Sequence, residues 1–138
     1  MNIPDILLGP GDTAPLLEQI LTAPNKPDGS IGDALDLTGA SVVFKYQPRD
    51  ASVAAAERSV GVNSDPTTGK TTLDWLATGG RLDAGGNATG LDFNARYVVT
   101  YPSGHQLSIP NGLDAFFGET EIREFLWLRV AADFTPVP

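Results

Sequence analysis

The stretch DFNARYVVTY, residues 92–101, alternates apolar and polar side chains more regularly than any other part of the chain. Successive side chains of a β-strand point to opposite faces of the sheet, and Val98 is the one apolar residue in the second set. The pattern therefore predicts a strand of an antiparallel sheet with one buried face. The residues of that face are Phe93, Ala95, Tyr97, Val99 and Tyr101.

Two further strands follow from the sequence around this stretch. Pro102-Ser103-Gly104 is a turn sequence, so residues 105–109 are expected to return as the second strand of a hairpin. Upstream, residues 41–47 are rich in β-branched and aromatic side chains, and Val42, Phe44 and Tyr46 form their predicted buried face.

The remaining strands have weaker signals. Residues 122–131 are apolar on both faces, which indicates a strand in the middle of a sheet. Residues 16–22 lie between two prolines and are expected to form a strand, and residues 71–76 alternate with Leu73 and Trp75 on one face. Residues 51–62 leave two alternatives open, a short helix between strands or a pair of small-residue strands.

The composition agrees with an all-β domain. The chain has 138 residues, with 15 Gly and 11 Pro spread along it, which favours several short strands joined by turns. About seven strands of this kind predict an antiparallel β-sandwich. We expect an extended N-terminal arm at residues 1–13, the sandwich domain at 14–134 and a C-terminal tail at 135–138.

Charge and cysteine content exclude several classes of function. Nine Lys and Arg against 17 Asp and Glu give a net charge of −8, which argues against nucleic-acid binding and against an anionic membrane surface. With no Cys, the chain has no thiol nucleophile, thiolate zinc site or disulfide. The N-terminus lacks the features of a secretory signal and no stretch is apolar enough to span a membrane, so we expect a product made in the cytoplasm.

The sequence contains no recognisable set of catalytic residues. His105 is the only histidine, and no G-x-S-x-G motif accompanies it, so a surface position in a strand is the expected role. Residues 64–71, SDPTTGKT, are close to the phosphate-binding loop pattern, but Ser64 stands where that pattern needs Gly and a strand follows Lys70. A hairpin turn at Thr68-Gly69 is the better interpretation. We therefore predict no catalytic residue, no cofactor and no enzymatic activity.

Acidic and aromatic residues could build other kinds of site. Loop aspartates such as Asp28, Asp33 and Asp36 could hold calcium, but their spacing does not match an EF-hand loop. We therefore expect them to be ordinary solvated side chains of loops. The aromatic side chains could form a sugar-stacking platform, although core packing explains most of them better. We accordingly predict no metal ligand. The aromatic residues concerned are Tyr46, Trp75, Tyr97, Tyr101 and Trp127.

Several short motifs occur in a fixed order along residues 11–131. They are GDTAP at 11–15, DLTGA at 36–40 followed by VVFK at 42–45, Thr68-Gly69, Gly90, FNARYVVTY at 93–101, PSG at 102–104, Ile109-Pro110 and the final strand 125–130. Together they resemble a small domain of tailed-phage virions, best known as the N-terminal module of baseplate upper proteins in siphophages. The loop 24–36 is longer than this module leads one to expect.

The resemblance implies an immunoglobulin-like β-sandwich that attaches virion parts to one another, without cofactor or catalysis. We therefore expect a structural virion protein of the tail, neck or baseplate, whose partners are other phage structural proteins, present as a homo-oligomeric ring or in multiple copies. A capsid decoration protein and a carbohydrate-binding β-sandwich module are the alternatives. The predicted contact residues are apolar side chains of the arm and of a late loop: Ile6, Leu7, Leu8, Leu113, Phe116 and Phe117.

For both groups of contact residues an alternative stays open. The arm residues could pack on their own domain instead of on a neighbour, and Phe116-Phe117 could tuck under the sandwich.

Overall fold

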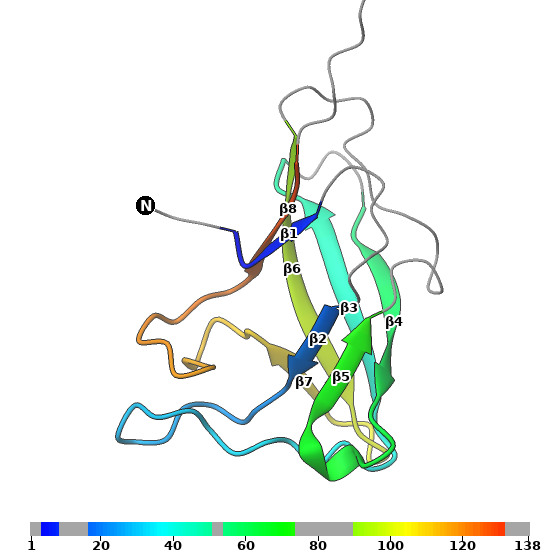
Figure 1. The fold of residues 1–138 in the computed structure, drawn as a ribbon, viewed down its shortest axis with the longest axis vertical. Coiled ribbons are helices and arrows are strands. Elements are labelled where there is room, and N and C mark those ends of the chain that lie inside the picture. The colour runs from blue at the N-terminus through cyan, green and yellow to red at the C-terminus, as the bar shows by residue number, and fades with distance from the viewer. Residues whose placement is uncertain (1–3, 9–16, 51–53, 74–89, 132–138) are drawn as a thin grey trace, which may run out of the picture.

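The computed structural model of this protein describes residues 4–8, 17–50, 54–73 and 90–131. These residues form strands and one 3₁₀ turn, and none of them lies in an α-helix (Figure 1). The all-β prediction is confirmed. The elements are β1 (Ile6–Leu8), β2 (Leu17–Ile20), β3 (Ser41–Pro48), β4 (Ala56–Val62), the 3₁₀ turn η1 (Pro66–Thr68), β5 (Lys70–Leu73), β6 (Leu91–Thr100), β7 (Gln106–Ile109) and β8 (Leu126–Val130).

The strands belong to one continuous mixed sheet. Its order is β1-β8-β6-β3-β4-β5-β2, with β7 paired to β6 beside this path. Every strand pair is antiparallel except β1 with β8, where Ile6 lies opposite Leu128 in a parallel arrangement. The prediction of a wholly antiparallel sheet is therefore wrong in this one pairing, which brings the N-terminal segment beside the last strand.

Strand β6 organises the sheet, as the alternation in its sequence predicts. It pairs with β3 along one edge, and its other edge pairs with β8 over Leu91–Ala95 and with β7 over Tyr97–Thr100. Four of the five predicted inward residues, Phe93, Ala95, Tyr97 and Val99, are buried. The fifth, Tyr101, follows the end of the strand and is half-buried. The predicted hairpin of β6 and β7 is confirmed.

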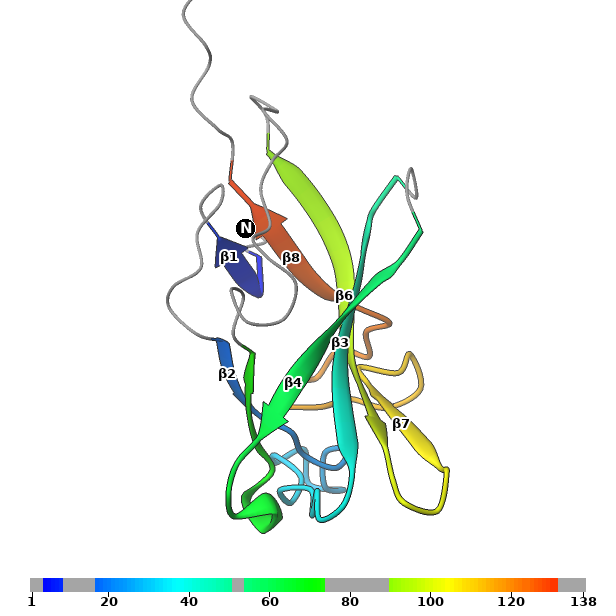
Figure 2. The ribbon, with the colours of Figure 1, turned by 90° about the vertical axis from the view of Figure 1, so that its right-hand side faces the viewer.

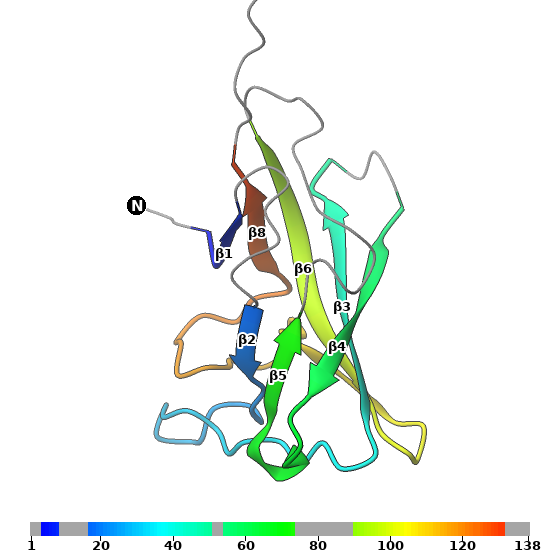
Figure 3. The same cartoon turned by 45° about the vertical axis from the view of Figure 1, so that its right-hand side comes forward.

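The sheet curls because β4 changes partner along its length. Ala56–Val60 pairs with β3, and then Gly61–Val62 pairs with β5. The short layer of β2 and β5 thus lies over β3 and β6, and the core fills the space between (Figures 2 and 3). Where a sandwich of two separate sheets was expected, the strands follow a single path through this corner.

One hydrophobic core lies inside the curl. Phe44 from β3 and Tyr97 from β6 meet edge to face with ring centroids 5.2 Å apart, and Tyr46 meets Phe93 in the same way at 5.8 Å. Leu73 joins them from β5 with no exposed surface. Edge-to-face contacts of this kind stabilise the core beyond the area that they bury.

Several boundaries differ from the predictions. The ambiguous segment 51–62 contains strand β4, and β8 begins at Leu126 instead of at 122. Residues 121 and 122 are exposed, while Arg123 forms an ion pair with Asp5. Four parts of the chain that the sequence analysis considered lie outside the described residues. They are Trp75 and the rest of 74–76, residues 77–89, which the sequence predicts to be a Gly-rich loop, most of the arm, and the tail 135–138.

Candidate interaction surfaces

The side chains considered above as metal ligands or catalytic groups lie in separate turns and loops of the described part of the chain. No three of the His, Asp and Glu side chains in that part are grouped so that they could hold a metal ion. Within the same part of the chain, no helix is long and apolar enough to cross a lipid bilayer. The acids considered as calcium ligands act in turns: Asp28 accepts hydrogen bonds from Ser30, and Asp36 accepts them from Thr38.

The single histidine belongs to an exposed turn. Ser103 Oγ and His105 Nδ1 lie 2.8 Å apart, and the His105 backbone N–H also points to Ser103 Oγ at 3.4 Å. This is the geometry of a serine that closes a turn. In the described ranges no carboxylate is bonded to the other ring nitrogen, so the pair lacks the orienting group of a catalytic triad.

The phosphate-loop-like sequence 64–71 is also a turn. Asp65 accepts hydrogen bonds from Thr67, the 3₁₀ turn η1 follows, and Gly69 ends it with φ 67°. Lys70 then starts β5. The predicted hairpin turn at Thr68-Gly69 is confirmed, and no helix follows the lysine as a phosphate-binding loop requires.

The predicted arm contacts divide between core and surface. Leu8 is only 6% exposed and belongs to the chain's own core, and Ile6 packs against that core. Leu7 between them is 62% exposed. Backbone hydrogen bonds from Asp5 to Trp127 and from Ala131 to Leu8 hold the segment on β8. Of the three residues, Leu7 alone is available to a neighbouring molecule.

The predicted loop contacts divide in the same way. Phe116 is 3% exposed and lies in the core, where its ring is 6.2 Å from that of the half-buried Phe117. Leu113 is 79% exposed. Phe116 thus packs in the chain's own core instead of contacting a partner, whereas Leu113 is free to contact one.

Leu113 belongs to a surface that we call the loop face, formed by residues 24–36 and 111–122. Both loops project from the same side of the molecule (Figure 1). Asn25 joins them: its side chain donates to the Glu119 carbonyl at 2.7 Å and accepts from the Gly118 N–H at 2.8 Å. Its backbone N–H also donates to the Ala115 carbonyl at 2.8 Å. The two loops therefore form one surface with a fixed arrangement.

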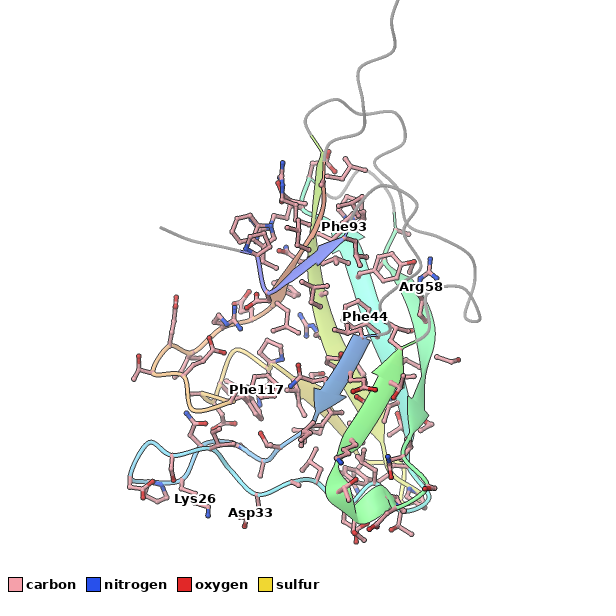
Figure 4. The ribbon with its side chains drawn as sticks, viewed as in Figure 1. Lys26, Asp33, Phe44, Arg58, Phe93 and Phe117 are labelled. Atoms are coloured by element: carbon pink, nitrogen blue, oxygen red, sulfur yellow. The ribbon has the colours of Figure 1, made fainter. Side chains whose placement is uncertain are left out.

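The loop face is acidic and partly apolar. Its two segments contain six Asp and Glu and one Lys, which gives a net charge of −5. Lys26 and Asp33 pair at 3.2 Å near the tip of the first loop (Figure 4). Three large aliphatic side chains are exposed among these charges, namely Ile31, Leu113 and Ile122.

A second surface lies on the opposite side of the sheet from the core, and we call it the outer face. It consists of the side chains of β3, β6 and β8 that alternate with the buried ones, with neighbours at the strand ends. A shallow hollow of about 340 Å³ lies on it between Lys45, Asn94, Arg96 and Phe125. The outer face comprises Val43, Lys45, Gln47, Arg49, Glu57, Asp92, Asn94, Arg96, Phe125, Trp127 and Arg129.

Two arginines of the outer face lie over aromatic rings. The Arg96 guanidinium is 4.4 Å from the centroid of Phe125, and that of Arg49 is 4.8 Å from the centroid of Trp127. Arg49 also donates from Nε to Asn94 Oδ1 at 3.1 Å. Such cation–π contacts fix the planes of the arginines while their other N–H groups stay available to an acceptor.

Asp92 neutralises only the neighbouring part of this surface. It accepts hydrogen bonds from Trp127 Nε1 at 2.7 Å and from Arg129 Nη1 at 2.9 Å. Partial burial alone would raise the pKa of Asp92, but these hydrogen bonds and the charges of Arg129 and Arg49 outweigh it and lower that pKa below its usual range. Glu57 pairs with Lys45 at 3.3 Å in a similar way.

Sequence reasoning missed the outer face. The prediction placed Trp127 in a strand that is apolar on both sides and assigned most of the aromatic residues to the core. Tyr97 is indeed buried, but Trp127 faces outward beneath Arg49. Arg129, two residues after Trp127, is the one signal in that strand that marks its outward side.

Comparisons with protein-family models, with curated proteins and with solved structures gave no match to this chain.

Proposed function

We propose that this protein is a non-catalytic docking component of a tailed-phage virion, in the tail, neck or baseplate. The observation that carries the proposal is the loop face, where three large aliphatic side chains are exposed on an acidic surface whose two loops are fixed by Asn25. Monomeric proteins seldom expose large apolar patches without a binding role. The phage context comes from the sequence resemblance.

The motifs of that resemblance have structural roles that support the proposal. In DLTGA, Asp36 accepts hydrogen bonds from the N–H and the hydroxyl of Thr38, and Leu37 is buried at 1% exposure. The Ala40 N–H then donates to the Leu37 carbonyl immediately before β3 begins. These residues build the turn that precedes the central strand β3. The motif therefore has a structural role in this chain, in addition to its similarity in sequence.

We infer an immunoglobulin-like arrangement in which the β2–β5 layer faces the layer of β3 and β6 across one core. The change of partner within β4 is compatible with it, because strands at the corners of such folds pass from one layer to the other.

Immunogold electron microscopy of particles from the cells that make this chain tests the proposal. An antibody against the chain should label the tail or the head–tail junction. Label spread over the head would favour capsid decoration, and unlabelled particles would contradict a virion role altogether.

Carbohydrate binding is less well supported by the surface. A sugar platform needs exposed ring faces, and one face of Trp127 is covered by Arg49. If host polysaccharide quenched the tryptophan fluorescence of the purified chain, this alternative would replace docking.

A further inference from the structure

The charges of this molecule are separated between two distinct surfaces. The loop face has a net charge of −5, whereas the outer face contains Lys45, Arg49, Arg96 and Arg129 against Asp92 and Glu57. Strands β3 and β6 of the outer face lie behind β2 and β5 in Figure 1, while the two loops project to the side. A positive surface on a chain of net charge −8 needs a specific explanation.

Among the described residues, the outer face has four basic side chains against two acidic ones. Lys45 and Arg96 stand directly opposite each other on β3 and β6, and like charges at such paired positions destabilise a sheet. Glu57 pairs with Lys45, but within the described ranges no carboxylate lies at ion-pair distance from Arg96 or Arg49. An acidic group placed beside Arg96 would offset its repulsion with Lys45.

The arginines are also arranged to receive carboxylates. Arg96 and Arg49 each lie over an aromatic ring, so their guanidinium planes are fixed before binding. A fixed guanidinium loses less entropy when it binds a carboxylate, and it can do so through two parallel hydrogen bonds. The hollow beside Arg96 and Phe125 offers room for an aliphatic side chain next to those charges.

We propose that the loop face of one copy of this chain docks on the outer face of the next copy. Asp33 and Glu121 of the loop face would lie over Arg49 and Arg96, and an exposed aliphatic side chain such as Leu113 would enter the hollow. The loop face combines what the outer face requires, namely carboxylates beside exposed apolar groups.

The proposed contact joins two different surfaces, so each copy keeps one surface free for a further copy. Such a head-to-tail contact closes into a ring or continues as a filament. This inference rests on the proposed docking function and specifies which surfaces would build the ring or repeated array.

Light scattering coupled to size-exclusion chromatography of the purified chain tests the inference. At low salt the mass should rise with concentration up to about 1 mM, which covers even weak contacts. Added salt should weaken association because it screens charged surfaces. A mass that stays monomeric over this whole range would overturn the proposal and would leave a different acidic partner as the occupant of the outer face.

Two charge-reversal variants locate the surfaces. The outer-face variant combines Arg49→Glu and Arg96→Glu, and the loop-face variant combines Asp33→Lys and Glu121→Lys. Each alone should weaken self-association at least about tenfold. A 1:1 mixture should regain association, because the intact loop face of the first variant fits the intact outer face of the second, and the two reversed faces again have opposite charges. Unchanged association of either variant, or no regained association in the mixture, would contradict the proposal.

A matched control reverses charges elsewhere. Glu18→Lys with Lys70→Glu changes exposed residues on β2 and β5 and should leave association unchanged. Thermal unfolding by circular dichroism checks that all variants fold. Immunogold labelling gives the independent result: a labelled tail with a monomeric purified chain would reject this inference alone, and an associating chain that is absent from particles would reject the virion role alone.

Discussion

The carboxylate of Asp92 and the indole of Trp127 are joined by a 2.7 Å hydrogen bond from β8 to β6. Arg129 donates to the same carboxylate, and Arg49 lies over the other side of the indole system at 4.8 Å from its centroid. A charged hydrogen bond thus fixes the aromatic ring that supports an arginine. The positions of Trp127 and Arg129 on the outer face therefore depend on this acid.

The substitution Asp92→Asn should destabilise the fold and make it less sensitive to acid. Loss of the charged hydrogen bonds should cost about 1–2 kcal/mol at neutral pH. The pKa of Asp92 is lowered in the folded protein, so its stabilisation is complete above the ordinary value of 3.8 and is lost as the pH falls through the folded value. Urea unfolding from pH 7 to pH 2 should therefore show a shallower acid decline in the variant. The exposed Glu18→Gln serves as the control, and equal acid declines in D92N and the wild type would contradict the assignment.

The residues of β1 give a second prediction, which separates a core role from a docking role. Leu8→Ala should reduce the free energy of unfolding by about 2–4 kcal/mol, because Leu8 is a buried core residue. The matched change Leu7→Ala, one residue away and 62% exposed, should change it by less than about 0.5 kcal/mol. Chemical denaturation measures both. If L8A were as stable as L7A, the first strand would be an arm that its own domain does not need.

The sequence predicts the strands whose signal is local. In β6 the alternation runs through five inward positions, and Pro102-Ser103-Gly104 follows directly, so both the strand and its hairpin can be read from neighbouring residues. The sequence of strand β4 is ambiguous because Ala54-Ala55-Ala56 favours a helix, whereas Val60-Gly61-Val62 favours a strand. Its pairing with β3 determines its conformation.

Features that depend on distant pairing were not predictable in this way. The parallel partner of Ile6 is Leu128, and no local pattern connects them. The curl depends on β4 changing partner at Gly61, which is a tertiary event. The outer face was missed for the same reason, because Phe125 and Trp127 read as apolar core residues until the arginines that cover them are known.

Two glycines with positive φ should respond differently to alanine. At Gly69, φ is 67° and a Cβ atom would lie 2.5 Å from the Leu21 carbonyl oxygen. At Gly104, φ is 90° and no atom lies within 4 Å of that position. Gly104→Ala should therefore cost only the backbone penalty of about 1–2 kcal/mol, whereas Gly69→Ala should cost clearly more, about 3 kcal/mol or above. Thermal unfolding compares them, and equal losses would show that the close approach at Gly69 is not rigid.

Tyr97→Phe should not destabilise the protein. Tyr97 is 1% exposed, and its hydroxyl has no hydrogen-bond partner within the part of the chain that the structure describes. Removal of an unsatisfied buried hydroxyl should be neutral or stabilising by up to about 1 kcal/mol. Burial also raises the pKa of Tyr97 above its ordinary value of 10.0, so the neutral form is favoured in the folded state and wild-type stability falls once the pH exceeds that value.

The alkaline decline therefore gives a second measurement for Tyr97. Urea unfolding between pH 9 and pH 11 should show a smaller loss for Y97F than for the wild type. Tyr101→Phe, at a half-buried position, is the control and should reduce the decline less. A clear destabilisation of Y97F at neutral pH would show that the hydroxyl makes a stabilising hydrogen bond.

Asn25→Ala should release the two halves of the loop face from each other. The side chain makes two hydrogen bonds to the second loop, at Glu119 and Gly118, and their loss should cost about 1–3 kcal/mol. Hydrogen exchange should accelerate in residues 111–122, while the protection of β6 should change little. Asn63→Ala is a matched control, because Asn63 accepts one hydrogen bond from Asp65 within its own turn. Since docking favours a surface that is ordered in advance, N25A should also weaken the self-association proposed above, and unchanged exchange in 111–122 would mean that the loop face is held by its other contacts.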